Sequence, residues 1–274
     1  MTQARNPWFI IECWQARGLL KTMIARDVKS RFAGSALGLT WAFLQPICMM
    51  GILWFVFTYG LKANPSGANL PFVAWFFPAQ IAWNFIQEGL LGGSGAITDY
   101  SFLVRKVNFR VELLPVVKIG SALVFHGIFL LLVIGVLILS GVYPNISWLM
   151  TLYFTFAAVV FLVGLGWLTS SLTVLFRDVQ QLLGVVAQLG FWGTPIIWRA
   201  DSLPESMRRW LVLNPVYYIT EGYRVAFTGH VSGSPWSWDI APGHTAVFWV
   251  MTLMITLLGR WVFKRLRPHF GDVL

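Results

Sequence analysis

Long apolar stretches separated by short polar segments recur along the whole of this 274-residue chain. Six such stretches begin near Leu37, Leu70, Leu113, Trp148, Val179 and His244. Each reaches or approaches the ~20 apolar residues that a helix needs to cross the hydrocarbon core of a bilayer. The pattern therefore predicts an all-α membrane protein whose six transmembrane helices form one domain over residues 1–274.

The composition supports a protein that lies mostly inside the membrane. Hydrophobic residues make up 57% of the chain and charged residues 11%, whereas a soluble domain is about a quarter charged. The two cysteines form no spacing motif, so we expect no structural disulfide. No short apolar region with a cleavage site precedes the first stretch, so we expect that stretch itself to direct insertion.

The distribution of basic residues predicts the orientation. Lysine and arginine collect on the cytoplasmic side of membrane proteins. With the N-terminus in the cytoplasm, only five of the twenty basic residues lie outside, namely Lys62, Arg199, Arg208, Arg209 and Arg224. Six spans then place both termini in the cytoplasm. The net charge of +9 fits attraction to anionic membrane lipids, and the dispersed charges do not indicate nucleic-acid binding.

Three segments outside the spans have helical patterns of their own. Residues 7–33 place apolar residues at helical spacing between basic ones, which predicts an amphipathic helix in the plane of the interface. That helix could be a membrane anchor or a partner-binding surface. Residues 98–112 form the largest internal cytoplasmic segment and favour a short amphipathic helix. Residues 200–242 predict two short re-entrant or surface-lying helices at the outer face, broken at Asn214-Pro215.

Isolated polar residues near or inside the spans suggest no catalytic site. Glu221 and Arg224 are three residues apart and can pair on one helix face. Glu88 and Lys118 lie near the cytoplasmic ends of spans, where a structural role is expected. His126 lies inside the third span, where it is either a functional group or a neutral side chain bonded to a neighbouring helix.

Several kinds of chemistry have no motif in the sequence. The chain contains no Gly-Lys pair, so it lacks the phosphate-binding loop of ATPases. It contains neither a zinc-protease motif nor a nucleophile elbow, and we assign no catalytic residue and no metal ligand. The last three spans contain no internal acid, so an ion-coupled carrier is not supported. Active transport would need energy from another subunit.

Five segments together resemble a known family. They are RDVKSRFAGSALGLTWAFLQP at 26–46, LVRKVNFRVELLP at 103–115, FRDVQQL at 176–182, WGTPIIW at 192–198 and LNPVYYITEGYR at 213–224. In this order they resemble the permease subunits of ABC-2 type exporters of O-antigen, capsular polysaccharide and teichoic acid. The resemblance runs from about residue 17 to the C-terminus.

The resemblance implies a homodimer in the inner membrane that works with two copies of a separate ATPase subunit. That subunit would bind ATP and Mg²⁺, so the permease itself would need no cofactor. The cargo would be a lipid-linked polysaccharide. The expected ATPase-coupling residues are Phe102, Arg105, Lys106, Asn108 and Phe109 in a coupling helix, with Arg26 and Asp27 in the interface helix. The expected outer-gate residues are Tyr217, Tyr218, Glu221 and Arg224.

Aromatic residues are the candidates for the translocation pathway, because flat rings can stack against the C–H groups of many sugars. The candidates are Trp41, Trp54, Phe57, Tyr59, Phe77, Trp83 and Trp192. For any one ring we favour a lipid-facing or interfacial position, whereas for the set as a whole we favour some role in lining the pathway. Two other functions stay open: export of a lipid or small amphipathic molecule, and an embedded enzyme acting on lipid-linked sugar. The enzyme would need a convergent acid, base or metal site, and the sequence offers none.

Overall fold

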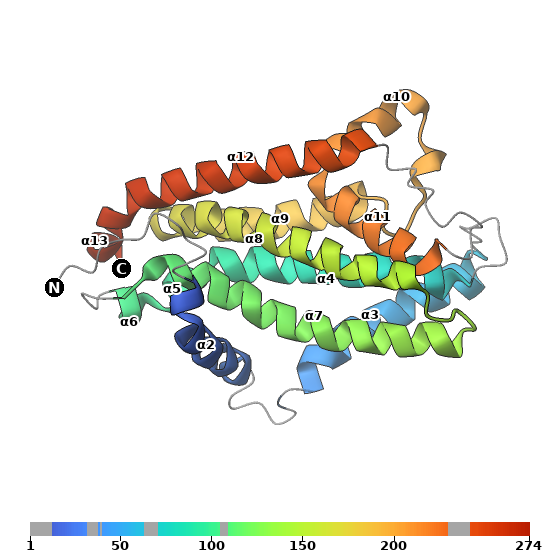
Figure 1. Cartoon of the computed structure of the whole chain (residues 1–274), viewed down its shortest axis with the longest axis horizontal. Coiled ribbons are helices and arrows are strands. Elements are labelled where there is room, and N and C mark those ends of the chain that lie inside the picture. Colours follow the sequence, from blue (N-terminus) through green and yellow to red (C-terminus); the bar gives the residue numbers. More distant parts are fainter. Residues whose placement is uncertain (1–12, 32–37, 39, 63–70, 105–108, 230–241) are drawn as a thin grey trace.

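The computed structural model describes residues 13–31, 38, 40–62, 71–104, 109–229 and 242–274, and this part of the chain is helical without strands. Six of its helices have sixteen or more residues: α3 (Thr40–Phe55), α4 (Phe72–Ser94), α7 (Leu114–Leu139), α8 (Met150–Leu175), α9 (Asp178–Gly193) and α12 (Pro242–Leu266). They run lengthwise between the two ends of an elongated bundle, in alternating directions (Figure 1). The prediction of an all-α fold is confirmed for the described residues.

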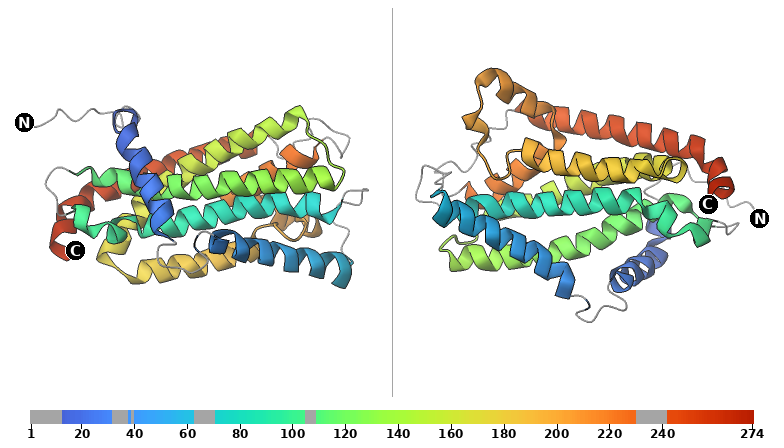
Figure 2. Two further views of the ribbon diagram at one scale, coloured as in Figure 1. Left: turned by 90° about the horizontal axis from the view of Figure 1, so that it is seen from below. Right: turned by 180° about the vertical axis from the view of Figure 1, so that it is seen from behind.

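Shorter elements gather at the two ends of the bundle. At one end lie α2 (Arg17–Ser30), α5 (Ala96–Asp99), α6 (Ser101–Val104), η2 (Val111–Leu113), η6 (Arg267–His269) and α13 (Phe270–Val273). Toward the other end lie η1 (Val56–Gly60), η3 (Ile146–Leu149), η4 (Ala200–Ser202), α10 (Glu205–Arg208), η5 (Arg209–Leu213) and α11 (Pro215–Thr228). Helix α2 lies crosswise to the long helices (Figure 2).

Four helical stretches of the described chain are long and apolar enough to cross a membrane. They are Phe43–Gly60, Val111–Leu139, Ile146–Leu175 and Gly243–His269. The other two predicted spans correspond to α4 and α9. Helix α9 has 16 residues, and α4 carries several polar side chains. Four of the six predicted spans are therefore supported by length and composition, and the remaining two stay a prediction.

Helix α4 lies at the centre of the bundle and packs against α7, α8 and α11. Phe76 and Ala79 are completely buried there. Some of its polar residues bond within the helix: Gln80 Nε2 donates to Asn84 Oδ1 at 2.9 Å, and Trp83 Nε1 donates to Gln87 Oε1 at 3.0 Å. A helix enclosed by protein can tolerate such residues because few of its side chains meet lipid.

Small residues bring α12 and α8 into close contact. A Cβ atom on Gly259 would lie 2.4 Å from the carbonyl oxygen of Gly164, and one on Gly164 would lie 2.9 Å from the Cα of Thr256. Membrane helices associate largely through such close packing, because lipid tails leave no hydrophobic drive between helices. The α8–α12 pair therefore depends on both glycines.

The outer segment breaks where the sequence changes from Asn214 to Pro215. The Asn214 side chain accepts hydrogen bonds from the backbone N–H groups of Val216 at 3.0 Å and Tyr217 at 3.3 Å, which caps the start of α11. Proline in the first turn costs no hydrogen bond, because that N–H has no partner within the helix. The position of these helices relative to a bilayer stays a prediction.

The predicted coupling segment differs from the expected single helix. In its described part, the one-turn helices α5 and α6 are separated at Tyr100, and η2 precedes α7. Residues Arg105, Lys106 and Asn108 lie outside the described residues.

Candidate functional site

A cluster of charged residues joins α2 to three other elements at one end of the bundle. Asp27 of α2 is only 1% exposed. Its carboxylate accepts from Lys118 Nζ of α7 at 2.8 Å, from the Tyr100 hydroxyl at 2.8 Å and from Arg31 Nε at 3.2 Å. A buried carboxylate with three donors is stabilised in its charged form. We call these residues, together with Asp99 and Glu88, the α2 charge cluster.

The remaining contacts extend the α2 charge cluster to α4 and α5. Lys118 Nζ also contacts Asp99 Oδ2 of α5 at 2.8 Å. Arg31 pairs with Glu88 near the end of α4. One lysine on α7 therefore bonds both α2 and the start of the predicted coupling segment, and one arginine on α2 bonds α4.

The local sequence explains why α2 reaches this position. Asp27 and Arg31 are four residues apart, so they lie on one face of α2. Gly120 of α7 leaves room for that helix, because a Cβ atom there would lie 2.5 Å from Ile24 Cδ1. The Ser121 hydroxyl donates to the carbonyl of Ile24 at 3.5 Å.

The proton positions of the α2 charge cluster follow from these contacts. Burial alone would raise the pKa of Asp27, but the hydrogen bonds from Lys118 and Tyr100 and the positive charge of Lys118 outweigh it and lower that pKa below its ordinary value. Burial, and then the bond to Asp27, raise the pKa of the Tyr100 phenol. At neutral pH Asp27 is therefore ionised and Tyr100 remains a donor.

The predicted coupling residues divide into surface and interior positions. Arg26 of α2 and Phe102 of α6 are exposed, and Phe109 is half-buried against the apolar cluster around Ile97. Asp27, in contrast, is buried within the α2 charge cluster. The geometry gives Asp27 the role of positioning α2, while Arg26 and Phe102 can reach another protein.

A second cluster surrounds Arg224 of α11 toward the opposite end. Arg224 is 4% exposed. Its Nε donates to the carbonyl of Trp75 at 3.1 Å, and its Nη2 donates to the carbonyls of Pro195 at 2.9 Å and Ile196 at 3.0 Å. The guanidinium also lies 4.0 Å from the centre of the Trp75 ring and pairs with Glu221. Arg224 thus joins α11, α4 and the segment after α9.

The polypeptide around Arg224 needs such a donor. The chain from Thr194 to Trp198 is irregular, so its carbonyls lack helical partners. On α4, Arg224 reaches the carbonyl of Trp75, in the turn that precedes Pro78. An arginine, with five donors in a planar fork, can serve several carbonyls at once.

The other predicted gate residues lie close to Arg224. The Tyr218 ring is buried and stacks on Phe248 at a centroid distance of 4.5 Å, and its hydroxyl donates to Thr245 at 3.2 Å. Tyr217 and Glu221 are half-buried. Of the four predicted gate residues, Tyr218 and Arg224 are therefore core residues that position α11.

Three of the predicted pathway aromatics are exposed. They are Trp41 of α3, Tyr59 of η1 and Trp192 of α9. Helices α3 and α9 lie on the same side of α4 (Figure 2).

The other pathway aromatics are at least partly covered. Trp83 is 4% exposed and packs against Phe191 of α9, with ring centroids 5.8 Å apart. Trp54, Phe57 and Phe77 are half-buried. In this arrangement Trp83 connects α4 to α9.

One polar network was not predicted from the sequence. The hydroxyl of Tyr223, which is fully buried, contacts His126 Nε2 of α7 at 2.8 Å and the hydroxyl of Thr155 on α8. Phe85 stacks on the imidazole at 4.7 Å. His126 is therefore bonded to a neighbouring helix, one of the two roles expected for it, and its position inside a span was the only signal.

The described residues offer little for cofactor or metal chemistry. They contain no group of three or more His, Cys, Asp or Glu side chains that could hold a metal ion. The two charged clusters consist of paired ions and backbone acceptors. Such an arrangement can bind elements together and transmit their movement.

Comparisons with known proteins agree with the membrane architecture. Residues 18–228 match the ABC-2 type transporter family. The chain is 28% identical over 223 residues to the O-antigen export system permease protein RfbA of Myxococcus xanthus, covering 80% of this chain and 84% of that protein. It is 22% identical to the polysialic acid transport protein KpsM of Escherichia coli, covering 87% and 90%.

A third relative extends the same group. The chain is 18% identical to the capsule polysaccharide export inner-membrane protein CtrC of Neisseria meningitidis serogroup B, over 78% of this chain and 80% of that protein. Because the family match covers well over half of the sequence, the chain belongs to the ABC-2 type transporter family.

Proposed function

We propose that this chain is the permease subunit of an ATP-driven exporter that moves a lipid-linked, O-antigen-like polysaccharide from the cytoplasm across the inner membrane. The observation that carries the proposal is the group of relatives, which are named as polysaccharide export or transport proteins and align over most of both chains. Export of a lipid or small amphipathic molecule is the second candidate, since the exposed apolar surfaces would also suit such a cargo.

In the proposed topology all six long helices cross the membrane. Helix α4 crosses inside the bundle, where α7, α8 and α11 shield its polar residues from lipid. Helix α9 crosses together with the irregular segment that follows it. The positions of α2 and α13 at one end of the bundle support cytoplasmic termini (Figure 1), as does the distribution of basic residues.

The energy would come from a separate ATPase subunit that binds ATP and Mg²⁺. Its docking surface would include Arg26 of α2 and Phe102 of α6, with Phe109 nearby and Arg105, Lys106 and Asn108 completing the segment. The α2 charge cluster would make α2 and α5 move as a unit with α7, because Lys118 bonds Asp27 and Asp99 at the same distance of 2.8 Å. Movement of the docked ATPase would then reach the spans.

A second copy of the chain would cover the side formed by α3 and α9. An apolar stripe of exposed residues runs along α9 at helical spacing: Leu182, Val185, Val186, Leu189 and Trp192. Helix α3 makes few contacts with its own bundle, and only 6% of its apolar stretch is buried. In a homodimer these faces would enclose a pathway, with Trp41, Tyr59 and Trp192 available to stack against sugars.

The outer end of that pathway would be covered by the outer segment. Tyr217 and Glu221 are half-buried on α11 and could contact a passing chain, whereas Arg224 would keep α11 in place.

The first test is purification of the tagged chain from its native membrane in mild detergent. We expect an ABC ATPase subunit to co-purify at one-to-one stoichiometry. A permease that purifies alone from cells shown to produce such an ATPase would contradict the proposal. In cells lacking the gene, polysaccharide should accumulate on the cytoplasmic face, and normal surface polysaccharide would exclude this cargo.

A matched pair of variants tests the docking surface. Phe102→Ala should reduce ATPase co-purification and export, because an exposed ring of α6 is lost. Phe156→Ala removes a comparably exposed ring from α8, within a span, and should leave both unchanged. Equal effects of the two substitutions would remove α6 from the docking surface.

A further inference from the structure

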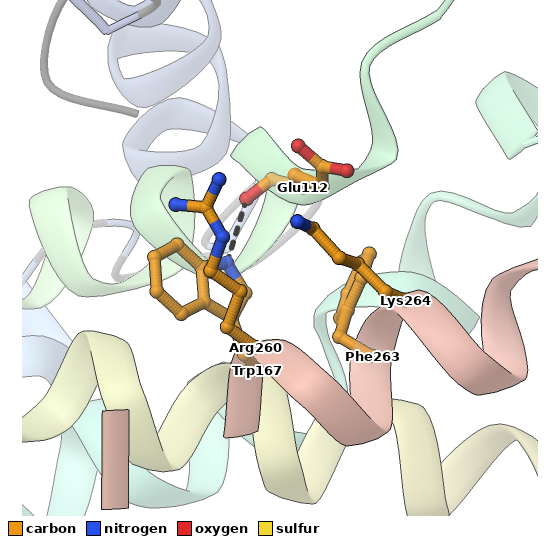
Figure 3. Close-up of a pocket in the computed structure, with 5 residues that line it drawn as sticks. All are labelled: Glu112, Trp167, Arg260, Phe263 and Lys264. Carbon is orange, nitrogen blue, oxygen red and sulfur yellow. Dashed lines mark hydrogen bonds between the residues drawn. The ribbon is translucent and has the colours of Figure 1, made fainter. Parts of the chain in front are cut away.

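A small pocket lies where α12 meets α8 and η2, at the same end as α2 and α13. It is lined by Glu112, Trp167, Arg260, Phe263 and Lys264, and its enclosed part measures about 10 Å³, the space of one water molecule. Figure 3 shows Arg260 and Lys264 extending from α12 on the side of the pocket where Glu112 lies. Pockets for drug-sized ligands measure about 300–1,000 Å³, so this pocket cannot enclose a ligand, and a bound group would lie at its open mouth.

The charge of the pocket favours an anion. Arg267 Nη1 contacts Glu112 Oε1 at 3.1 Å, so the carboxylate that lines the pocket already has a cationic partner. Arg260 and Lys264 add two further positive charges next to this pair. Among the side chains that the structure describes here, three basic groups lie around one carboxylate, so these groups together carry an excess of positive charge.

The wall of the pocket is rigid and apolar beneath these charges. Phe263 and Trp167 are buried, and Trp167 Nε1 donates to the carbonyl of Glu112 at 3.0 Å (Figure 3). This bond holds η2 against α8. The basic side chains therefore surround a surface of defined shape.

An exposed apolar stripe of α12 leads directly to the pocket. Val250, Leu253 and Leu257 are all more than half exposed. They are followed at the same helical spacing by Arg260 and Lys264, so the five residues share one face of α12. Helix α12 lies at the outer edge of the bundle and packs mainly on α8 (Figure 1). An apolar stripe that ends in two cations is complementary to a lipid with an anionic headgroup.

We propose that this pocket binds the phosphate headgroup of an anionic phospholipid, with an acyl chain lying along the exposed stripe of α12. Basic pockets between membrane helices bind such headgroups, and each basic residue near the surface contributes about 1 kcal/mol. The bound lipid connects α12 to η2, which leads into α7. The site requires neither polysaccharide nor ATPase, so it is independent of the proposed transport function.

The test measures lipid binding to the purified full-length chain in mild detergent by native mass spectrometry. Phosphatidylglycerol and phosphatidylcholine are added separately at equal mole fraction. We expect one phosphatidylglycerol to be retained in preference to phosphatidylcholine. The double variant Arg260→Gln/Lys264→Gln should weaken phosphatidylglycerol binding roughly 30-fold, the change equivalent to about 2 kcal/mol for two basic residues.

Two further double variants complete the design. Arg208→Gln/Arg209→Gln removes two positive charges from the opposite end and should bind phosphatidylglycerol like the unmodified chain. Arg260→Lys/Lys264→Arg keeps the charges and should also retain the lipid, which keeps the test decisive if the neutral variant does not fold. Equal retention of both lipids, or undiminished binding by the folded neutral variant, overturns the proposal.

Inorganic phosphate tests whether the bound phosphate group comes from a lipid headgroup or from free phosphate. Added alone at millimolar concentration, it should neither displace phosphatidylglycerol nor raise the melting temperature of the chain. Displacement of the lipid together with stabilisation would identify free phosphate as the ligand and refute the lipid assignment.

Discussion

Replacing Arg224 by alanine should severely destabilise the end of the bundle where α11 lies. The guanidinium donates to three backbone carbonyls, of Trp75, Pro195 and Ile196, and all three lie in buried surroundings. A hydrogen bond to a charged group contributes about 1.5–3 kcal/mol, and an abandoned buried acceptor costs its full desolvation. Three bonds correspond to about 4.5–9 kcal/mol.

Part of this loss of stability is offset, because Arg224→Ala no longer buries a charged group. We therefore expect a loss of about 4 kcal/mol, near the lower limit. For a chain of this length each kcal/mol lowers the melting temperature by about 2–4 °C, so the expected shift is roughly 10 °C. Arg224→Lys should lose about half as much, since a single ammonium cannot serve carbonyls on two elements as the planar fork does.

The assay is thermal unfolding of the purified chain in mild detergent, read by the fraction that remains monodisperse. Arg209→Ala is the control, because that arginine pairs with Glu205 at 3.2 Å on the exposed surface and should contribute about 0–0.5 kcal/mol. If Arg224→Ala melts within 2 °C of Arg209→Ala, Arg224 does not hold the three elements together and the argument fails.

Three further substitutions test other contacts, each by the same thermal assay. The pKa of Asp27 is lower in the folded chain than its ordinary 3.8, so its contribution to the free energy of unfolding is complete above that pH and is lost as the pH falls through the folded-state value. The unmodified chain should therefore lose more stability on acidification than Asp27→Asn does. Parallel pH profiles of the two proteins would contradict this. Gly259→Ala places a Cβ atom 2.4 Å from a backbone oxygen of α8 and should reduce the folded yield strongly, whereas Gly127→Ala, with open space around it, should not. Tyr223→Phe removes a buried hydroxyl bonded to α7 and α8 and should cost about 1–3 kcal/mol, against almost nothing for the exposed Tyr143→Phe; equal melting temperatures for the two would disprove the role of the network.

Local chemistry made some elements predictable. The pattern after Asn214-Pro215 predicts a helix from Val216 to Phe227, and α11 runs from Pro215 to Thr228. The Asn214 cap and Pro215 act on the few residues that follow them, so the local sequence contains the cause of this helix start. The long apolar helices are also predictable from local sequence, because an apolar stretch of sufficient length can cross the bilayer as a helix.

Tertiary contacts explain what the sequence did not predict. Tyr100 separates α5 from α6 in the predicted coupling segment, and its hydroxyl bonds Asp27, 73 positions earlier. The spacing of Glu221 and Arg224 indicates their pairing, but the Trp75 carbonyl that also holds Arg224 is 149 positions away. The four-residue spacing of Asp27 and Arg31 indicates that these two members of the α2 charge cluster can pair. The contact with Lys118 depends on the tertiary structure, which brings α7 next to α2.

The central position of α4 also has a consequence for how the protein is made. Gln80, Asn84 and Glu88 make this helix a poor substrate for insertion by itself, because the translocon admits segments according to their own apolarity. The helices that shield it, α7, α8 and α11, are synthesised later. In the proposed topology, stable integration of α4 would therefore wait until α7 and α8 have left the ribosome, and a nascent chain that stops before α7 would leave α4 exposed to membrane quality control.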